Sequence, residues 1–136
     1  MKRRIMIAVP AAGVLALMVS GPVFGQKPPL AMLDQLEKGR WEMRIRDKAG
    51  EVEQLCLNSA RSFIQLRHPR AICERMTISD DINAVTVQYT CHGQGYGRTS
   101  IRRESNGLIQ IDSQGIAGGL PFAFIAEARR VGDCAG

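Results

Sequence analysis

Residues 97–115 read GRTSIRRESNGLIQIDSQG, and this stretch decides the fold class. Ser105-Asn106-Gly107 separates two runs of alternating character, and an Asn-Gly pair tolerates the positive φ angles of a tight hairpin turn. The sequence therefore predicts two antiparallel strands, at 97–104 and 108–115. Ile109 and Ile111 share one face of the second strand and are expected to point inward.

The β pattern continues on both sides of this hairpin. Apolar and polar residues alternate in the neighbouring segments, and polar or glycine-rich turns separate them. Further strands are predicted at 40–46, 51–57, 72–79, 84–92 and 121–131. Five more side chains are expected to face inward from these strands, namely Val85, Val87, Tyr89, Phe122 and Phe124.

Two short helices are expected beside the strands. Leucines at helical spacing predict a turn or two before Gly39, and Asn58 or Ser59 can cap a helix near 59–66 that ends at His68-Pro69. His68 is expected to be solvated or to contact that helix end. The predicted fold class is α+β, mostly β: an antiparallel meander of about five to seven strands, forming a curved sheet or a partly closed barrel, with the short helix near 59–66 over an opening or an edge.

The first 25 residues have the three parts of a secretory signal peptide. Met1-Lys2-Arg3-Arg4 is basic, residues 5–19 are largely apolar, and Val23-Phe24-Gly25 ends in a small residue at a cleavage site before Gln26. We expect a signal peptide at 1–25, a leader with a short helical turn at 26–39, and a single β-rich domain at 40–136. Removal of the signal implies a periplasmic or secreted protein with no stable membrane span.

Cleavage also changes the charge of the chain. Removing the three basic residues Lys2, Arg3 and Arg4 lowers the formal net charge from +5 to +2, and such a small charge argues against a nucleic-acid partner. Twelve arginines and three lysines remain after residue 25. That bias fits solvated strand faces with Arg-carboxylate pairs, or an anionic partner in the cell envelope.

The four cysteines all follow the expected cleavage site, which places them in an oxidising compartment where disulfides form. Cys56, Cys73, Cys91 and Cys134 allow three pairings, among which sequence alone does not choose. Chain order favours Cys56 with Cys73 and Cys91 with Cys134, since the first bridge would bracket the short helix. A thiol redox site and a zinc site at Cys91-His92 are the weaker alternatives.

Five segments of the chain carry a resemblance to a known family, namely Leu36-Glu37-Lys38-Gly39-Arg40-Trp41-Glu42, Cys56-Leu57-Asn58-Ser59, Cys73, Tyr89-Thr90-Cys91 and Val131-Gly132-Asp133-Cys134. Together they resemble the bacterial domain of unknown function 3617. The resemblance spans nearly the whole chain after the signal. It implies an exported, four-cysteine protein of proteobacteria, and it implies no activity. At the start of the β-rich domain this chain has Lys38-Gly39-Arg40-Trp41, where the family often has Pro-Gly-Leu-Trp, and this departure is mild.

Candidate chemistry is sparse. We expect no catalytic residue, cofactor or metal site, because no nucleophile-elbow, zinc-protease or calcium-loop motif occurs. His92 and Tyr96 flank a glycine-rich loop and form the one possible functional loop. The apolar stretch 114–121 is expected to be a sheet corner, or a lip or interaction edge exposing Ile116 and Leu120.

Three functions remain open on these grounds. The first is a non-enzymatic binding or envelope-accessory protein whose partner is an unknown envelope component. The second is a carrier of a small apolar ligand, in a pocket lined by Val85, Val87, Tyr89, Ile109, Ile111, Phe122 and Phe124. The third is an enzyme with His92 in its site. The oligomeric state is left open.

Overall fold

The computed structural model describes residues 28–135 as one antiparallel sheet with two short helices packed on it. The sheet has the strand order β2-β1-β7-β6-β5-β4-β3. The expected signal peptide, its cleavage site and the first residues of the leader lie outside the described residues. The elements are α1 (Ala31–Asp34), β1 (Gly39–Ile45), β2 (Val52–Leu57), the 3-10 helix η1 (Ala60–Gln65), β3 (Glu74–Asp80), β4 (Ala84–Cys91), β5 (Gly95–Ser105), β6 (Leu108–Ala117) and β7 (Leu120–Gly132).

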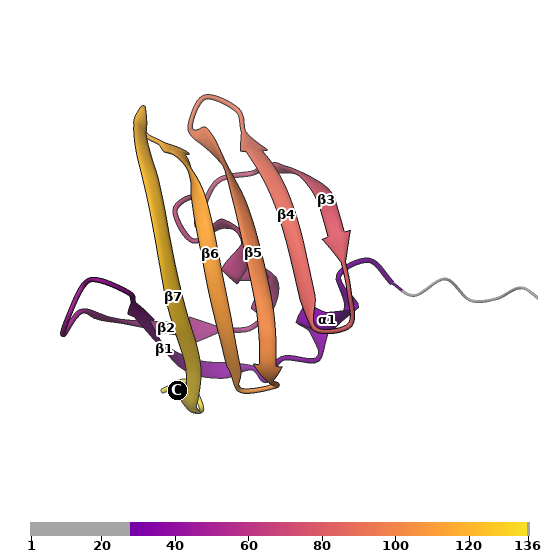
Figure 1. Ribbon diagram of the computed structural model, residues 1–136, viewed down its shortest axis with the longest axis vertical. Coiled ribbons are helices and arrows are strands. Elements are labelled where there is room, and N and C mark those ends of the chain that lie inside the picture. Colours follow the sequence, from indigo (N-terminus) through magenta and orange to yellow (C-terminus); the bar gives the residue numbers. More distant parts are fainter. Residues whose placement is uncertain (1–27, 136) are drawn as a thin grey trace, which may run out of the picture.

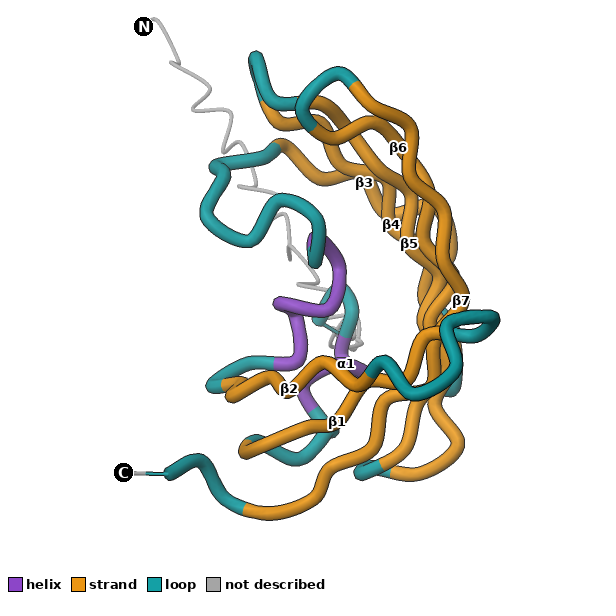
Figure 2. Tube along the Cα trace, turned by 90° about the vertical axis from the view of Figure 1, so that its left-hand side faces the viewer, coloured by secondary structure: helices purple, strands orange, loops and turns teal. Residues whose placement is uncertain are grey.

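The sheet is strongly curved and remains open. Figure 1 shows β3 to β7 side by side as a meander, and Figure 2 shows this meander as a curved wall with both helices on its inner side. The hairpin of β1 and β2 joins the meander through pairing of β1 with β7. The predicted class, mostly β with an antiparallel curved sheet and few short helices, is confirmed. Because β2 and β3 are edges of the sheet, the curved sheet replaces the barrel alternative.

The core lies between the inner face of the sheet and the two helices. Along β4 the buried residues alternate with less buried ones, which is the period-2 pattern that a sheet with one covered face imposes. Trp41 on β1 is fully buried and contacts Phe63 of η1 edge to face, with ring centroids 5.2 Å apart. Its indole Nε1–H donates to the Glu37 carbonyl at 3.0 Å. The helices therefore supply the apolar surface that covers the curved sheet.

An ion pair holds the two helices together. The Arg61 guanidinium donates from Nε and Nη2 to both carboxylate oxygens of Asp34, at 2.9 and 2.8 Å, and also to the Pro29 carbonyl. Hydrogen bonding to Arg61 lowers the pKa of the Asp34 carboxyl. The cap of η1 is Ser59, whose hydroxyl accepts from the Arg61 N–H. The helix predicted near 59–66 is thus present, with 3-10 geometry.

The Asn-Gly hairpin forms at the predicted place by a different turn. Ser105 pairs with Leu108 across Asn106 and Gly107, but neither turn residue has a positive φ. A register shift between Arg103 and Ser105 instead inserts a bulge, and a bulge increases the local right-handed twist. The positive φ angles occur in the next hairpin, where Gly118 and Gly119 have φ of 57° and 79°. Such angles suit a two-residue turn between strands.

The disulfides are Cys56–Cys134 and Cys73–Cys91, so the preferred pairing from chain order was wrong. Cys73 directly precedes β3 and lies beside Cys91 because β3 and β4 pair with Glu74 opposite Thr90. Cys56 on β2 and Cys134 beyond β7 are brought together because β1 lies between these two strands and pairs with both. The long-range pairing of β1 with β7 decides the connectivity.

These bridges bear on the compartment of the protein. Disulfides form and persist in oxidising compartments and are rare in the reducing cytosol. All four cysteines are paired, which is typical of a protein located outside the cytosol. Within residues 28–135, no helix has the length and apolar character needed to cross a membrane.

Candidate functional site

The inner face of the sheet is packed where the apolar pocket was expected. Six of the seven expected pocket residues belong to the buried core, and the seventh, Phe122, is half-buried against it. The reason is the filling of the concave face by η1 and α1, with Phe63, Leu33 and Met32 fully covered there. Among the described residues, the seven side chains do not line a common hollow. The six buried ones are Val85, Val87, Tyr89, Ile109, Ile111 and Phe124.

His68 is buried rather than solvated, and its backbone contacts the end of η1, where its N–H donates to the Gln65 carbonyl at 2.9 Å. Its Nε2 lies 3.0 Å from the Gln94 carbonyl oxygen and its Nδ1 lies 3.2 Å from the Tyr89 hydroxyl. Because a carbonyl only accepts, Nε2–H is the donor to Gln94. The ring therefore fastens the segment after η1 to β4 and to the turn between β4 and β5.

Two glycines make room for this arrangement. Tyr89, Gly97, Gly115 and Phe122 are cross-strand neighbours on β4, β5, β6 and β7. A Cβ on Gly97 would lie 2.4 Å from the Tyr89 hydroxyl oxygen, and one on Gly115 would lie 2.1 Å from the Tyr96 carbonyl oxygen. Both distances are too short for a side chain, so these positions require glycine.

The burial of the Tyr89 phenol can be tested directly. Desolvation by burial raises the pKa of its phenol above the usual value of about 10. The chain has two tyrosines, so the variant Tyr96→Phe leaves Tyr89 as the only one. We expect the phenolate absorbance of folded Tyr96→Phe to appear at higher pH than in the same variant unfolded in urea.

The raised pKa also predicts a loss of stability in alkali. Above the pKa of the unfolded chain, Tyr89 ionises when unfolded and stays protonated when folded, so the free energy of unfolding should fall as the pH rises through this window. The matched control is Tyr89→Phe, in which this contribution to the pH dependence should disappear. Coincident phenol titrations of folded and unfolded Tyr96→Phe would contradict a buried Tyr89.

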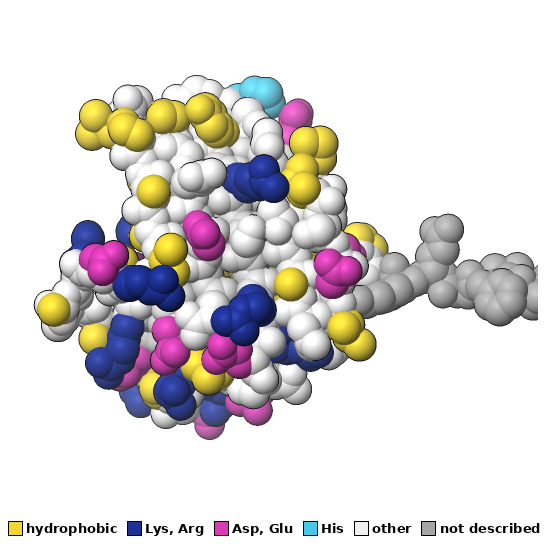
Figure 3. Space-filling model, viewed as in Figure 1, with side chains coloured by type: hydrophobic (Ala, Val, Ile, Leu, Met, Phe, Trp, Pro, Cys, Tyr) yellow, Lys and Arg dark blue, Asp and Glu magenta, His cyan; other side chains and the backbone are white. Residues whose placement is uncertain are grey.

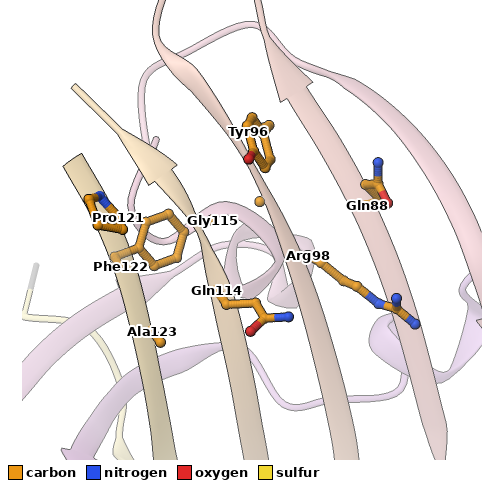
Figure 4. Close-up of a pocket in the computed structure, with 9 residues that line it drawn as sticks. Gln88, Tyr96, Arg98, Gln114, Gly115, Pro121, Phe122 and Ala123 are labelled. Carbon is orange, nitrogen blue, oxygen red and sulfur yellow. The ribbon is translucent and has the colours of Figure 1, made fainter. Parts of the chain in front are cut away.

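The outer face of the sheet carries a hollow of about 430 Å³. It extends over four adjacent strands, β4 to β7, with the backbone of Gly97 and Gly115 between the side chains. Figure 4 shows Arg98 and Gln114 extending their guanidinium and amide groups across the sheet toward β4. The lining residues are Gln88, Tyr96, Gly97, Arg98, Gln114, Gly115, Pro121, Phe122 and Ala123.

Register places three of these polar side chains in one row. Gln88 is opposite Arg98, and Arg98 is opposite Gln114. All three side chains are exposed, and within residues 28–135 none of them makes a hydrogen bond or ion pair with another side chain. The next row on the same face differs, since Thr86 and Ser100 hydrogen-bond each other at 2.9 Å. The row of Gln88, Arg98 and Gln114 therefore has hydrogen-bond donors and acceptors that other side chains of the described residues do not use.

Charge is distributed unevenly over this outer face. In Figure 3 most Lys, Arg, Asp and Glu side chains lie in the lower half of the face, and the upper half is mainly apolar or neutral. Arg98 is the one charged residue that lines the hollow, and no acidic residue lines it. Tyr96 adds an aromatic ring that is 51% exposed. The hollow is thus neutral to positive, with one exposed aromatic ring.

No family model, curated protein or solved structure matches this chain. The candidate site is therefore defined by the geometry of its residues alone. Gln88, Arg98 and Gln114 were predictable as outward positions, because buried or half-buried residues flank each of them along its strand. Their assembly into one row was not, because it depends on the register among β4, β5 and β6.

The structure separates the two residues of the expected functional loop. Tyr96 lies in β5 and lines the hollow, whereas His92 lies in the turn before β5, outside that lining. The His92 side chain is 76% exposed, and its Nε2 is 3.3 Å from Glu74 Oε1. Cys91 is held in a disulfide, so it is not a free thiolate for the zinc alternative. Among the described residues, no group of three or more His, Cys, Asp or Glu is placed to hold a metal.

The free edge at β3 is a second exposed feature. Met76 and Ile78 are 56% and 44% exposed on this edge strand. A register shift between Thr77 and Ser79 makes a bulge there, and Glu74 and Asp80 place carboxylates at the two ends. Bulges and charged residues are the means by which proteins prevent edge strands from pairing with other chains. These features therefore oppose the pairing of the β3 edge with a strand of another chain.

Proposed function

We propose that this protein is an exported, non-catalytic domain that binds a component of the cell envelope through the hollow on its outer face. One observation carries the proposal: the row of Gln88, Arg98 and Gln114 is exposed and unpaired beside the ring of Tyr96. Unpaired planar polar groups together with an aromatic ring are the usual means of orienting a ligand in a shallow site. The two disulfides are compatible with the proposed periplasmic or secreted location.

Two further parts of the proposal rest on the sequence. Residues 1–25 are proposed to be a signal peptide cleaved between Gly25 and Gln26. Membership in the bacterial domain of unknown function 3617 is proposed from the cysteine and tryptophan segments that resemble it. Neither part assigns an activity, so the functional proposal depends on the hollow.

The packed interior favours surface binding over the carriage of a small apolar ligand. A carrier needs an enclosed apolar volume that removes most of its ligand from water. Here the corresponding side chains contact one another and the two helices in the core. An enzyme centred on His92 is supported by one exposed contact, with Glu74.

Site-directed photo-crosslinking in cells that export the protein tests this proposal. A photo-reactive residue at Gln114 should give a covalent adduct with an envelope component, and Arg98→Gln in the same protein should weaken that adduct. The matched control is the same photo-reactive residue at Arg102, which is exposed on the same face but outside the hollow. Equal adducts from both positions, or none from Gln114, would overturn binding at the hollow.

A further inference from the structure

We infer that the ligand of the outer-face hollow is an acidic polysaccharide, an inference that rests on the proposed function. The chemistry of the lining selects this class of ligand in three ways. The amides match sugar hydroxyls, the exposed tyrosine ring matches the face of a sugar ring, and the one arginine of the lining matches a carboxylate.

The backbone at the row of Gln88, Arg98 and Gln114 is not free for strand addition. Gln88, Arg98 and Gln114 lie on β4, β5 and β6, and each of these strands is paired on both sides. Their backbone N–H and C=O groups are therefore used within the sheet, and an extended peptide has no free ladder there. Recognition at this row has to come from side chains.

The side chains of the hollow suit hydroxyl groups. Gln88 and Gln114 each offer an acceptor oxygen and an NH₂ with two donors, and a sugar hydroxyl likewise donates and accepts. Tyr96 combines an exposed apolar ring with a polar hydroxyl, so it can pack on the C–H face of a sugar and still hydrogen-bond. A purely apolar ligand would leave both amides without partners.

Arg98 selects an anionic sugar. Its guanidinium has no carboxylate partner among the described residues, unlike Arg102, which pairs with Glu104 at 3.0 Å. A planar guanidinium binds a carboxylate through two parallel N–H donors. No acidic residue lines the hollow to oppose this contact.

The extent of the hollow favours a chain over a single sugar. The lining runs from Gln88 on β4 to Pro121 on β7. With neighbouring strands about 4.8 Å apart, these two strands are about 14 Å apart across the sheet. The hollow is open along the surface, so a longer polymer can continue past it on both sides.

Titration calorimetry with two defined oligosaccharides tests this assignment. Hexagalacturonate carries a carboxylate on every sugar, and maltohexaose is a neutral hexamer. We expect hexagalacturonate to bind about tenfold or more tighter than maltohexaose, since a hydrogen bond to a charged group contributes at least that factor. Arg98→Gln should remove this preference, and Tyr96→Ala should weaken binding of both oligosaccharides.

Arg102→Gln is the matched control, because Arg102 is a second exposed arginine on the outer face of β5. It should leave both affinities unchanged, and circular dichroism of every variant should match the parent protein. Equal losses in Arg98→Gln and Arg102→Gln would show non-specific charge attraction and overturn the assignment. Absence of binding by either hexamer would also overturn it. A protein adduct at Gln114 would in that case leave the proposed binding function intact, whereas failure of both experiments would overturn both.

Discussion

Removing the bridge between Cys56 and Cys134 should lower the free energy of unfolding by about 4.5 kcal/mol. The bridge joins residues 78 positions apart, and a cross-link over a long loop removes much conformational freedom from the unfolded chain. Cys56 is exposed and Cys134 half-buried, so alanine at both positions disturbs little packing. Urea unfolding of the double alanine variant against the parent protein measures this difference.

The second bridge provides the comparison. Cys73 and Cys91 are 18 positions apart, for which the same model assigns about 3 kcal/mol. Trypsin can cut between all four cysteines, for example after Arg61, Arg75 and Arg98. A non-reducing digest should therefore yield one peptide pair for each bridge. A pair joining Cys56 to Cys73 would contradict the connectivity, and an unchanged urea midpoint in the first variant would contradict the expected stabilisation.

Trp41→Ala should cost about 3–5 kcal/mol of stability, in the range of large aromatic residues removed from cores. Trp41 has no exposed surface, and its ring packs edge to face on Phe63. The substitution leaves a cavity between β1 and η1 and removes the donor to the Glu37 carbonyl. The shift of the denaturation midpoint at constant slope measures the loss.

Trp41→Phe separates the ring from its hydrogen bond. Phenylalanine keeps an aromatic ring beside Phe63 and leaves the Glu37 carbonyl without its indole donor. The expected loss is therefore smaller than for alanine. A Trp41→Ala protein with the stability of the parent would show that this contact does not hold η1 on the sheet.

The strands were predictable because burial on one face imposes a period that is local in the sequence. Val85, Val87 and Tyr89 alternate with less buried residues, and they form the inner face of β4 as expected. The Asn-Gly hairpin was located for the same local reason. Its turn geometry was not, because the bulge that replaces positive φ depends on the pairing of β5 with β6.

The remaining features depend on contacts between distant parts of the chain. The cysteine pairing follows from β1 lying between β2 and β7, a placement that no local pattern encodes. His68 was expected to be solvated or to contact the helix end, because it precedes Pro69 in a loop, yet its ring is buried against Tyr89, 21 positions away. The row in the outer hollow likewise needs the register of three strands. The sequence thus predicted the elements and their inner faces. It did not predict the disulfide pairing, the burial of His68 or the row on the outer face, because these depend on the order and register of the strands in the sheet.

The strand order has a consequence for the sequence of events in folding. β7 lies third in the sheet and, among the strands of residues 28–135, it alone joins the β1–β2 hairpin to the meander. A nascent chain that lacks residues 120–132 has no partner for the outer side of β1, and contacts over such long separations form slowly. The hairpin carrying Trp41 therefore cannot dock on the meander before residues 120–132 have been synthesised, so the long-range pairing of β1 with β7 is expected to be a late step in folding.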